Sequence, residues 1–228
     1  DAYKSLEDYN SKYSSPHVLS ALAEQYLSEY QDSVALNYYN EALELAPDYG
    51  PAMIGKAEVM RMTMKYDEYF KCLDDYVSLP LESVEAKSGY LTALLRRLDP
   101  KFIRRFTPKL DEIMDRTLQV HPSDSSALSL AGLYYYSTNR PAKAKENFGR
   151  NAQLHPASLS ASASYVEFLM YSQDWEALSQ EGQKKFEQFP KEVAFLEMAT
   201  LAEHNLEHYD KVIDLCDRVL ALDYADTS

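Results

Sequence analysis

Three prolines at a constant spacing constrain this chain more than any other feature of its sequence. Pro122, Pro156 and Pro190 each close a phrase of about 34 residues. Between the first two, a pair of amphipathic segments of about a dozen residues flanks the turn-forming stretch 137–141. A period of this size, built from two short helices, is typical of repeat architectures in which each helix pair buries its apolar face against its neighbours.

The phrase between the first two of these prolines predicts two closely packed helices. Ala131, Gly132 and Ala144 are small enough to let the helix backbones approach each other. Tyr135 and Phe148 fill the space around that contact. These positions resemble the pattern of the tetratricopeptide repeat (TPR) family, which has a large residue, then Leu, Gly, Tyr, Ala, an aromatic and a closing Pro. Those seven positions are filled here by Leu128, Ala131, Gly132, Tyr135, Ala144, Phe148 and Pro156.

The same two-helix repeat recurs along most of the chain, with varying similarity to the pattern. The resemblance implies an all-α fold class, a right-handed α-solenoid of stacked antiparallel helix pairs forming a single domain over residues 1–228. An uncapped last repeat with Val212, Leu215 and Val219 on its outer face indicates a fragment of a longer array. The expected parts are an N-terminal helix within 1–15, repeats at 16–47, 48–80, 81–122, 123–156, 157–190 and 191–223, and the start of a truncated repeat at 224–228.

The repeat at 81–122 is irregular. It spans about eight residues more than one period, and its helices are expected at 83–98 and 108–120. The excess at 99–108 is bounded by prolines and carries three large apolar residues. We expect a short extra helix there, either a packed spacer or a binding insertion.

Composition and charge narrow the function classes. The chain has 46% hydrophobic residues and only 6 Gly in 228 residues, which suits a helical core. Its formal net charge of -13 would repel a phosphate backbone, so nucleic acid is excluded as a partner. No apolar run approaches the roughly 20 residues of a membrane span. Cys72 and Cys216 fall in second helices of different repeats and are expected to be buried free thiols.

Residues 204–208 spell H-x-x-E-H, a pattern that one group of zinc peptidases uses on a single helix. In the repeat register, His204 ends a first helix and His208 lies in the following turn, so the two imidazoles do not share a helix. A third ligand is not evident. We interpret the pattern as a turn with solvated histidines. Nucleophile motifs and phosphate-binding glycine loops are missing from the sequence as well. The sequence therefore predicts no enzyme, no metal and no cofactor.

The resemblance also implies a binding surface, because the first helices of stacked TPR-like pairs line an inner, concave wall. In that register the wall is acidic and aromatic, which favours an extended or helical peptide with basic and apolar side chains. Packing between repeats is the alternative interpretation for Tyr136, Met170 and Tyr171. The expected wall residues are Glu24, Leu27, Glu58, Arg61, Tyr90, Tyr136, Glu167, Met170, Tyr171, Glu197 and His204.

The function implied by the resemblance is a non-enzymatic scaffold for protein–protein interaction. Two alternatives stay open: self-assembly through the uncapped last repeat, and a regulatory or accessory role within a larger envelope protein, enzyme or transporter. The acidic, Tyr-rich composition also resembles TPR modules of bacterial envelope proteins, while a cytoplasmic protein is equally compatible with it.

Overall fold

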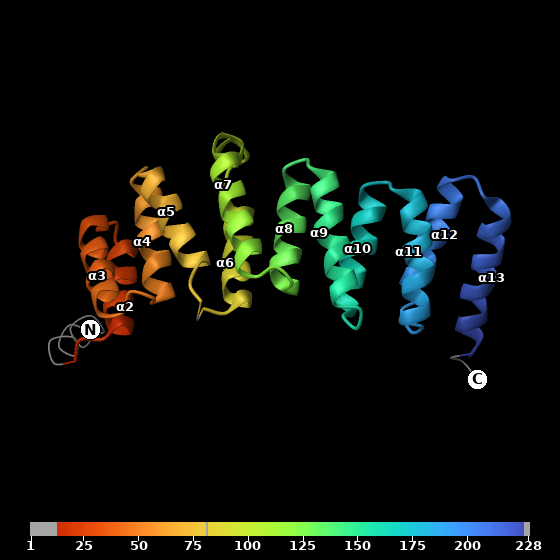
Figure 1. Cartoon of the computed structure of the whole chain (residues 1–228), viewed down its shortest axis with the longest axis horizontal. Helices are drawn as coiled ribbons and strands as arrows, with labels where there is room; N and C mark the ends of the chain where they lie inside the picture. The colour runs from red at the N-terminus through yellow and green to blue at the C-terminus, as the bar shows by residue number, and fades with distance from the viewer. Residues whose placement is uncertain (1–12, 81, 226–228) are drawn as a thin grey trace. The chain divides into compact units, whose positions relative to one another are not determined.

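The computed structural model describes residues 13–80 and 82–225, with side chains as far as Leu222. These residues form twelve helices and no strand (Figure 1). The predicted all-α class of stacked, TPR-like antiparallel helix pairs is confirmed, whereas the helix expected within 1–15 lies almost entirely outside the described residues. The helices are α2 Pro16–Ser28, α3 Asp32–Leu45, α4 Gly50–Met62, α5 Tyr66–Val77, α6 Val84–Arg97, α7 Pro100–Val120, α8 Ser125–Ser137, α9 Pro141–Leu154, α10 Leu159–Tyr171, α11 Trp175–Gln188, α12 Ala194–Asn205 and α13 Tyr209–Ala225.

The helices group into two compact units. Unit 1 ends at Pro122 and contains α2 to α7, and unit 2 begins at Ser123 and contains α8 to α13. In unit 2 each helix contacts the next along the chain, from α8 to α13. In unit 1 the same order holds from α2 to α5, and α5 also contacts α7. A single continuous domain stays a prediction. No helix among residues 13–80 and 82–225 is both long and apolar enough to cross a bilayer.

One turn geometry joins the two helices of five of the six hairpins in the described ranges. In the first hairpin, the Gln31 N–H donates to the Tyr26 carbonyl at 2.9 Å and the Tyr30 N–H donates to the Leu27 carbonyl at 3.0 Å. These paired bonds define a Schellman motif, which places one residue in the left-handed region. The residues with positive φ are Tyr30, Met64, Asn139, Gln173 and Glu207.

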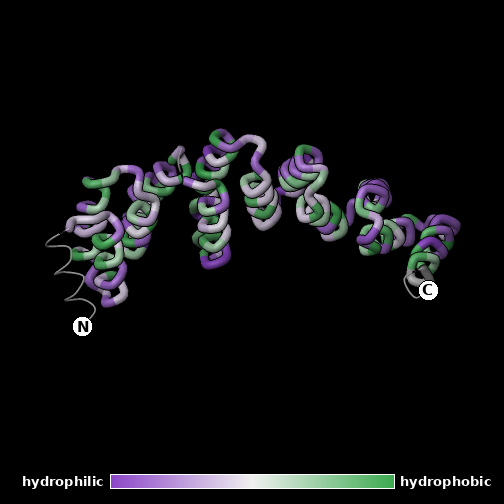
Figure 2. Tube along the Cα trace, turned by 90° about the horizontal axis from the view of Figure 1, so that it is seen from below, coloured by the Kyte–Doolittle hydropathy of each residue, from purple (hydrophilic) through white to green (hydrophobic). Residues whose placement is uncertain are grey.

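The seam between the two helices of a hairpin is made of small and aromatic side chains. A Cβ atom on Gly132 would lie 2.8 Å from the ring of Phe148, so the ring occupies the space that glycine leaves. Leu128, Ala131 and Ala144 around this contact are fully or almost fully buried. Hydrophobic and hydrophilic residues alternate along each helix (Figure 2). The local packing predicted from the sequence is therefore present.

The short extra helix predicted at 99–108 is present as the N-terminal part of the 21-residue span α7. It begins at Pro100, and a kink at Phe106, whose backbone dihedrals are not helical (φ -108°, ψ 16°), separates it from the helix that follows, two residues before Pro108. Asp99 caps the helix by accepting the Lys101 N–H. The rings of Phe102 and Phe106 pack on Tyr66 of α5, with centroids 5.4 and 4.8 Å apart. Because the kink accommodates the proline, the apolar residues can pack without ending the helix.

The C-terminal helix also differs from expectation. Helix α13 continues through Tyr224 to Ala225, so no new repeat begins at Tyr224. Leu215 is not an uncapped surface residue, because it is 2% exposed and packs on Leu196 and Ala199 of α12. Both cysteines are free, but Cys216 is exposed rather than buried. Helix α13 therefore buries the face that packs on α12 and exposes the opposite face to water.

Candidate functional site

In unit 1, two of the predicted wall residues, Arg61 and Tyr90, contact a third, Glu58 of α4. Arg61 pairs with the Glu58 carboxylate at 2.9 Å, and the Tyr90 hydroxyl of α6 donates to Glu58 Oε1 at 3.2 Å. Arg97 lies 3.5 Å from the same oxygen. Burial, reinforced by the Glu58 charge, raises the pKa of Tyr90, so this hydroxyl stays protonated and keeps donating.

The remaining predicted wall residues of unit 1 lie on α2. Glu24 is exposed and Leu27 is half-buried, and neither joins the Glu58 cluster. The cluster itself is saturated, because its carboxylate already has partners from two helices. Its role is to join α4 to α6, since a carboxylate shared among several donors is poorly available to a ligand.

In unit 2, three other predicted residues line one small apolar hollow, which we call the aromatic cup. Tyr136 comes from α8, and Glu167 and Tyr171 come from α10. The cup has a volume of about 190 Å³. Its complete lining is Ser129, Leu133, Tyr136, Phe148, Ser164, Glu167, Phe168 and Tyr171.

The base of the aromatic cup is buried and its rim is exposed. Phe168 meets Tyr136 edge to face with centroids 5.6 Å apart, and it meets Phe148 with centroids 5.3 Å apart. Phe168 is only 4% exposed, whereas Tyr136, Leu133 and Tyr171 are 43%, 47% and 65% exposed. Packing between repeats therefore does not account for most of the surface of these two tyrosines. Tyr136 packs on the buried ring of Phe168 but is 43% exposed, and Tyr171 is 65% exposed.

Three predicted wall residues of unit 2 do not line the cup. Met170 is half-buried on α10, and Glu197 and His204 are exposed on α12. The ring of His204 lies against that of Tyr209, with centroids 6.2 Å apart. The structure thus supports a local cup rather than one continuous lining within this unit.

The two histidines of the H-x-x-E-H pattern do not share a helix, as the repeat register predicts. Helix α12 ends at Asn205, and His208 lies in the turn that precedes α13. There, His208 Nδ1 pairs at 2.7 Å with Glu203, which also binds Ser179 and Lys211. Within the described parts of the chain, no group of three or more His, Cys, Asp or Glu side chains is placed to hold a metal ion.

Sequence reasoning missed Leu133 and Phe168 as parts of the cup. Ser129, Leu133 and Tyr136 follow an i, i+4, i+7 spacing, as one exposed stripe of a helix requires. That spacing could have identified Leu133. Phe168 is 4% exposed and packs against Phe148, and it also lines the cup.

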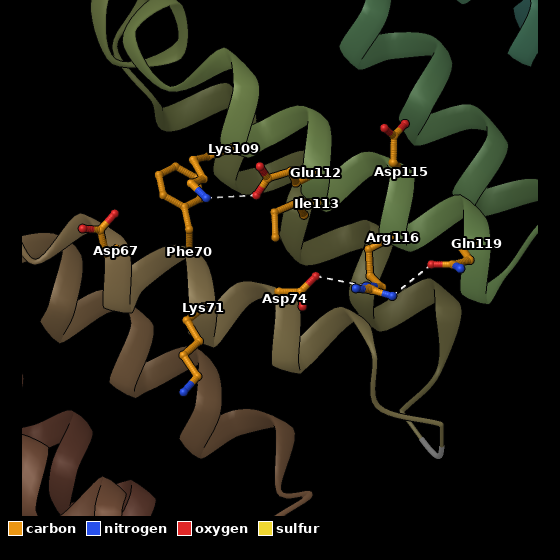
Figure 3. Close-up of a pocket in the computed structure, with 10 residues that line it drawn as sticks. All are labelled: Asp67, Phe70, Lys71, Asp74, Lys109, Glu112, Ile113, Asp115, Arg116 and Gln119. Carbon is orange, nitrogen blue, oxygen red and sulfur yellow. Dashed lines mark hydrogen bonds and ion pairs between the residues drawn. The ribbon is translucent and has the colours of Figure 1, made fainter.

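A larger hollow of about 590 Å³ lies in unit 1 between α5 and α7 (Figure 3). Its side chains are mostly charged and pair with one another: Arg116 binds Asp74 at 3.2 Å, and Lys109 binds Glu112 at 3.0 Å (Figure 3). Arg116 also donates to Gln119 at 2.9 Å. Because these charges largely neutralise one another across the hollow, this surface offers a ligand little beyond what water already provides.

Several solved structures of TPR proteins are similar to this chain. YrrB, described as a TPR protein with an unusual peptide-binding site, is 14% identical, with 97% of this chain and 92% of YrrB covered and a TM-score of 0.44. PilW, a type IV pilus biogenesis factor, is 15% identical, with coverage of 90% and 92% and a TM-score of 0.48. A tetratricopeptide repeat protein from Parabacteroides merdae is 13% identical, with coverage of 90% and 79% and a TM-score of 0.43.

These similarities concern the fold alone, and they do not extend to a shared partner or activity. No protein-family model matches the sequence, and no curated protein matches it.

Proposed function

We propose that this chain is a non-enzymatic scaffold that binds a protein partner through an extended or helical peptide segment, with the aromatic cup of unit 2 receiving one apolar side chain. The observation that carries the proposal is the exposure of Leu133, Tyr136 and Tyr171 around a single hollow. Large apolar groups gathered in one place on a surface, rather than scattered singly, are typical of interaction sites. Aromatic residues in such pockets supply much of the binding energy of protein interfaces.

The size of the cup favours a side chain over a small-molecule ligand. Its volume of about 190 Å³ is below the roughly 300–1,000 Å³ of pockets that enclose drug-sized ligands. One Leu, Met or Phe side chain suits a hollow of this kind. Tyr136 and Tyr171 would cover such an anchor from two helices, and their rings lose little conformational entropy on binding.

Charge supports a basic residue next to that anchor. Glu167 lines the cup and is exposed, and no basic group of the described residues forms an ion pair with it. The chain as a whole carries a formal net charge of -13. A Lys or Arg of the partner beside its apolar anchor would meet an available carboxylate, and the overall field would accelerate its approach at low ionic strength.

Selection from a displayed peptide library on the full chain tests this function. The proposal expects enrichment of segments that combine an apolar anchor with a neighbouring Lys or Arg. A peptide so selected should bind Tyr171→Ala at least about tenfold more weakly, since interface aromatic residues often contribute more than about 1.4 kcal/mol. Leu154→Ala is the matched control, because Leu154 is 45% exposed at the end of the second helix α9. Equal binding by both variants contradicts the proposal.

Self-assembly is the second candidate, and the exposed apolar stripe of α13 favours it. Ile213 and Leu220 are 62% and 53% exposed on one helix. Sedimentation at increasing protein concentration distinguishes this candidate from the first. A dimer that disappears in the Ile213→Glu, Leu220→Glu double variant supports self-assembly, and a monomer at every concentration excludes it.

A further inference from the structure

Unit 2 contains a second hollow, of about 730 Å³, between the second helices α9 and α11. We call it the basic pocket. It shares no lining residue with the aromatic cup. Four basic and two acidic side chains line it, a local excess of two positive charges in a chain whose formal net charge is -13. The charged lining residues are Lys145, Glu146, Arg150, Glu181, Lys184 and Lys185.

Lys185 is the unusual member of this lining. Only 4% of the residue is exposed, yet the one acceptor that the described residues offer its ammonium is Gln188 Oε1, at a distance of 3.3 Å. An ammonium has three donors, and burying it without a carboxylate partner is costly. Burial lowers the pKa of Lys185, and the charge of Glu181, which Lys184 also pairs with, offsets this only in part.

Gln188 cannot turn away from this lysine without losing another bond. Its Nε2 donates to the Pro156 carbonyl at 2.6 Å, which leaves Oε1 directed to Lys185. The amide thus fixes the ammonium at the pocket wall. The Gln188 oxygen is neutral, so it does not neutralise the charge of the Lys185 ammonium 3.3 Å away. A bound anion would do so.

Two further donors of the pocket lack protein acceptors in the part of the chain that the structure describes. Arg150 of α9 is exposed and forms no ion pair or hydrogen bond there. The Tyr165 hydroxyl of α10 lines the pocket beside Gly149, where a Cβ atom would lie 3.5 Å from it. By contrast, the other cations are engaged: Lys145 binds Asp174 at 2.6 Å, and Lys184 binds Glu181 at 3.3 Å.

We propose that the basic pocket binds a small anion carrying two or more negative charges, held by Arg150 and Lys185 with the Tyr165 hydroxyl as a third donor. Phosphate groups and polycarboxylates share this chemistry, because both present several oxygens to a guanidinium and an ammonium. A nucleic-acid backbone is not the favoured source, because a long polyanion would lie against a chain whose formal net charge is -13.

Titration calorimetry on the full chain at low salt tests the proposal, with inorganic pyrophosphate and citrate as probes. Saturable binding of one anion per chain is expected, and the tighter probe identifies phosphate or carboxylate as the source. The Arg150→Gln variant should bind about tenfold more weakly. Arg218→Gln is the matched control, because Arg218 is an exposed arginine on α13 outside the pocket. The Arg218→Gln variant loses the same positive charge as Arg150→Gln, but it should leave the affinity for the anion unchanged.

Lys185→Met separates binding from folding. Removing an unpaired buried ammonium should raise the melting temperature of the free chain while it abolishes anion binding. A lower melting temperature with unchanged anion affinity would instead assign Lys185 a purely structural role and overturn the proposal. So would a failure of both probes to bind, or equal weakening by the Arg150 and Arg218 variants.

Discussion

The rings of Tyr136 and Phe168 meet edge to face, with centroids 5.6 Å apart and planes at 86°. One ring is 43% exposed and the other is 4% exposed, so the contact joins the surface of α8 to the core of unit 2. Binding at the aromatic cup and packing between successive helix pairs therefore share one aromatic contact.

This contact predicts a modest loss of stability in Tyr136→Ala. Edge-to-face aromatic pairs contribute about 0.5–1.5 kcal/mol beyond the area they bury. We expect the variant to lower the free energy of unfolding by about 1–2 kcal/mol, measured by urea denaturation, and to keep its helical circular dichroism. Tyr136→Phe retains the ring and should be nearly neutral. If the phenylalanine variant lost as much stability as the alanine variant, the ring contact would not be the cause.

Gly132→Ala tests the seam of the hairpin α8–α9. The added Cβ would lie 2.8 Å from the Phe148 ring. Displacing that ring should cost about 1–3 kcal/mol, which outweighs the roughly 1 kcal/mol that alanine gains over glycine in a helix. Gly89→Ala on α6 is the control, because its Cβ would meet nothing within 4 Å. Thermal unfolding should therefore move in opposite directions for these two variants, and a stabilised Gly132→Ala would contradict the packing described.

Glu203 predicts a pH dependence of stability. It is 2% exposed, and burial alone would raise the pKa of its carboxyl, but hydrogen bonds from Ser179, His208 and Lys211 outweigh burial and hold the pKa below its usual range. A lowered folded-state pKa stabilises the protein above the unfolded-state value of about 4.3, and this contribution disappears as the pH falls through the folded-state pKa.

Glu203→Gln should consequently lower the unfolding free energy at pH 7 by about 2 kcal/mol, the scale of hydrogen bonds to a charged group. The difference from the unsubstituted chain should shrink as the pH falls below about 4. Denaturant midpoints measured from pH 3 to 7 report this directly. A difference that stayed constant over that range would show that the carboxylate charge is not responsible.

The left-handed turn residues predict a stabilising substitution. Met64 has φ 60° and is 74% exposed, so its side chain contributes little to packing. Met64→Gly removes the steric cost of that conformation and should stabilise the chain by about 0.5–1 kcal/mol in urea denaturation. Asn139→Gly is the comparison, since Asn tolerates the left-handed region and its replacement should gain less. A larger gain at Asn139 than at Met64 would count against this explanation.

The hairpins could be predicted from the sequence because their causes are local. The proline period and the pairing of Gly132 with Phe148 depend on residues within one repeat. The short helix before Pro108 could be predicted because prolines bound it, whereas the sequence did not show that the chain continues directly into the next helix across a kink at Phe106.

The candidate sites were less predictable because they depend on which side chains stay exposed after neighbouring pairs stack. The spacing within α8 places Leu133 beside Tyr136, but the hollow that they share with Phe168 and Tyr171 forms only where α8 and α10 meet. The environment of Lys185 likewise depends on a distant contact. The Gln188 amide that accepts from its ammonium also donates to the carbonyl of Pro156, 32 residues earlier. Contacts of this kind are set by the three-dimensional arrangement of repeats rather than by the repeat pattern.

Site-specific photo-crosslinking measures most directly whether the aromatic cup contacts a partner. A photoreactive phenylalanine analogue at position 171, and the same analogue at position 154 as a control, would be exposed to a peptide selected from the displayed library. The account predicts a cross-link from position 171 to the apolar anchor of the peptide and none from position 154. Cross-links from position 154 alone, or equal yields from both positions, would contradict it.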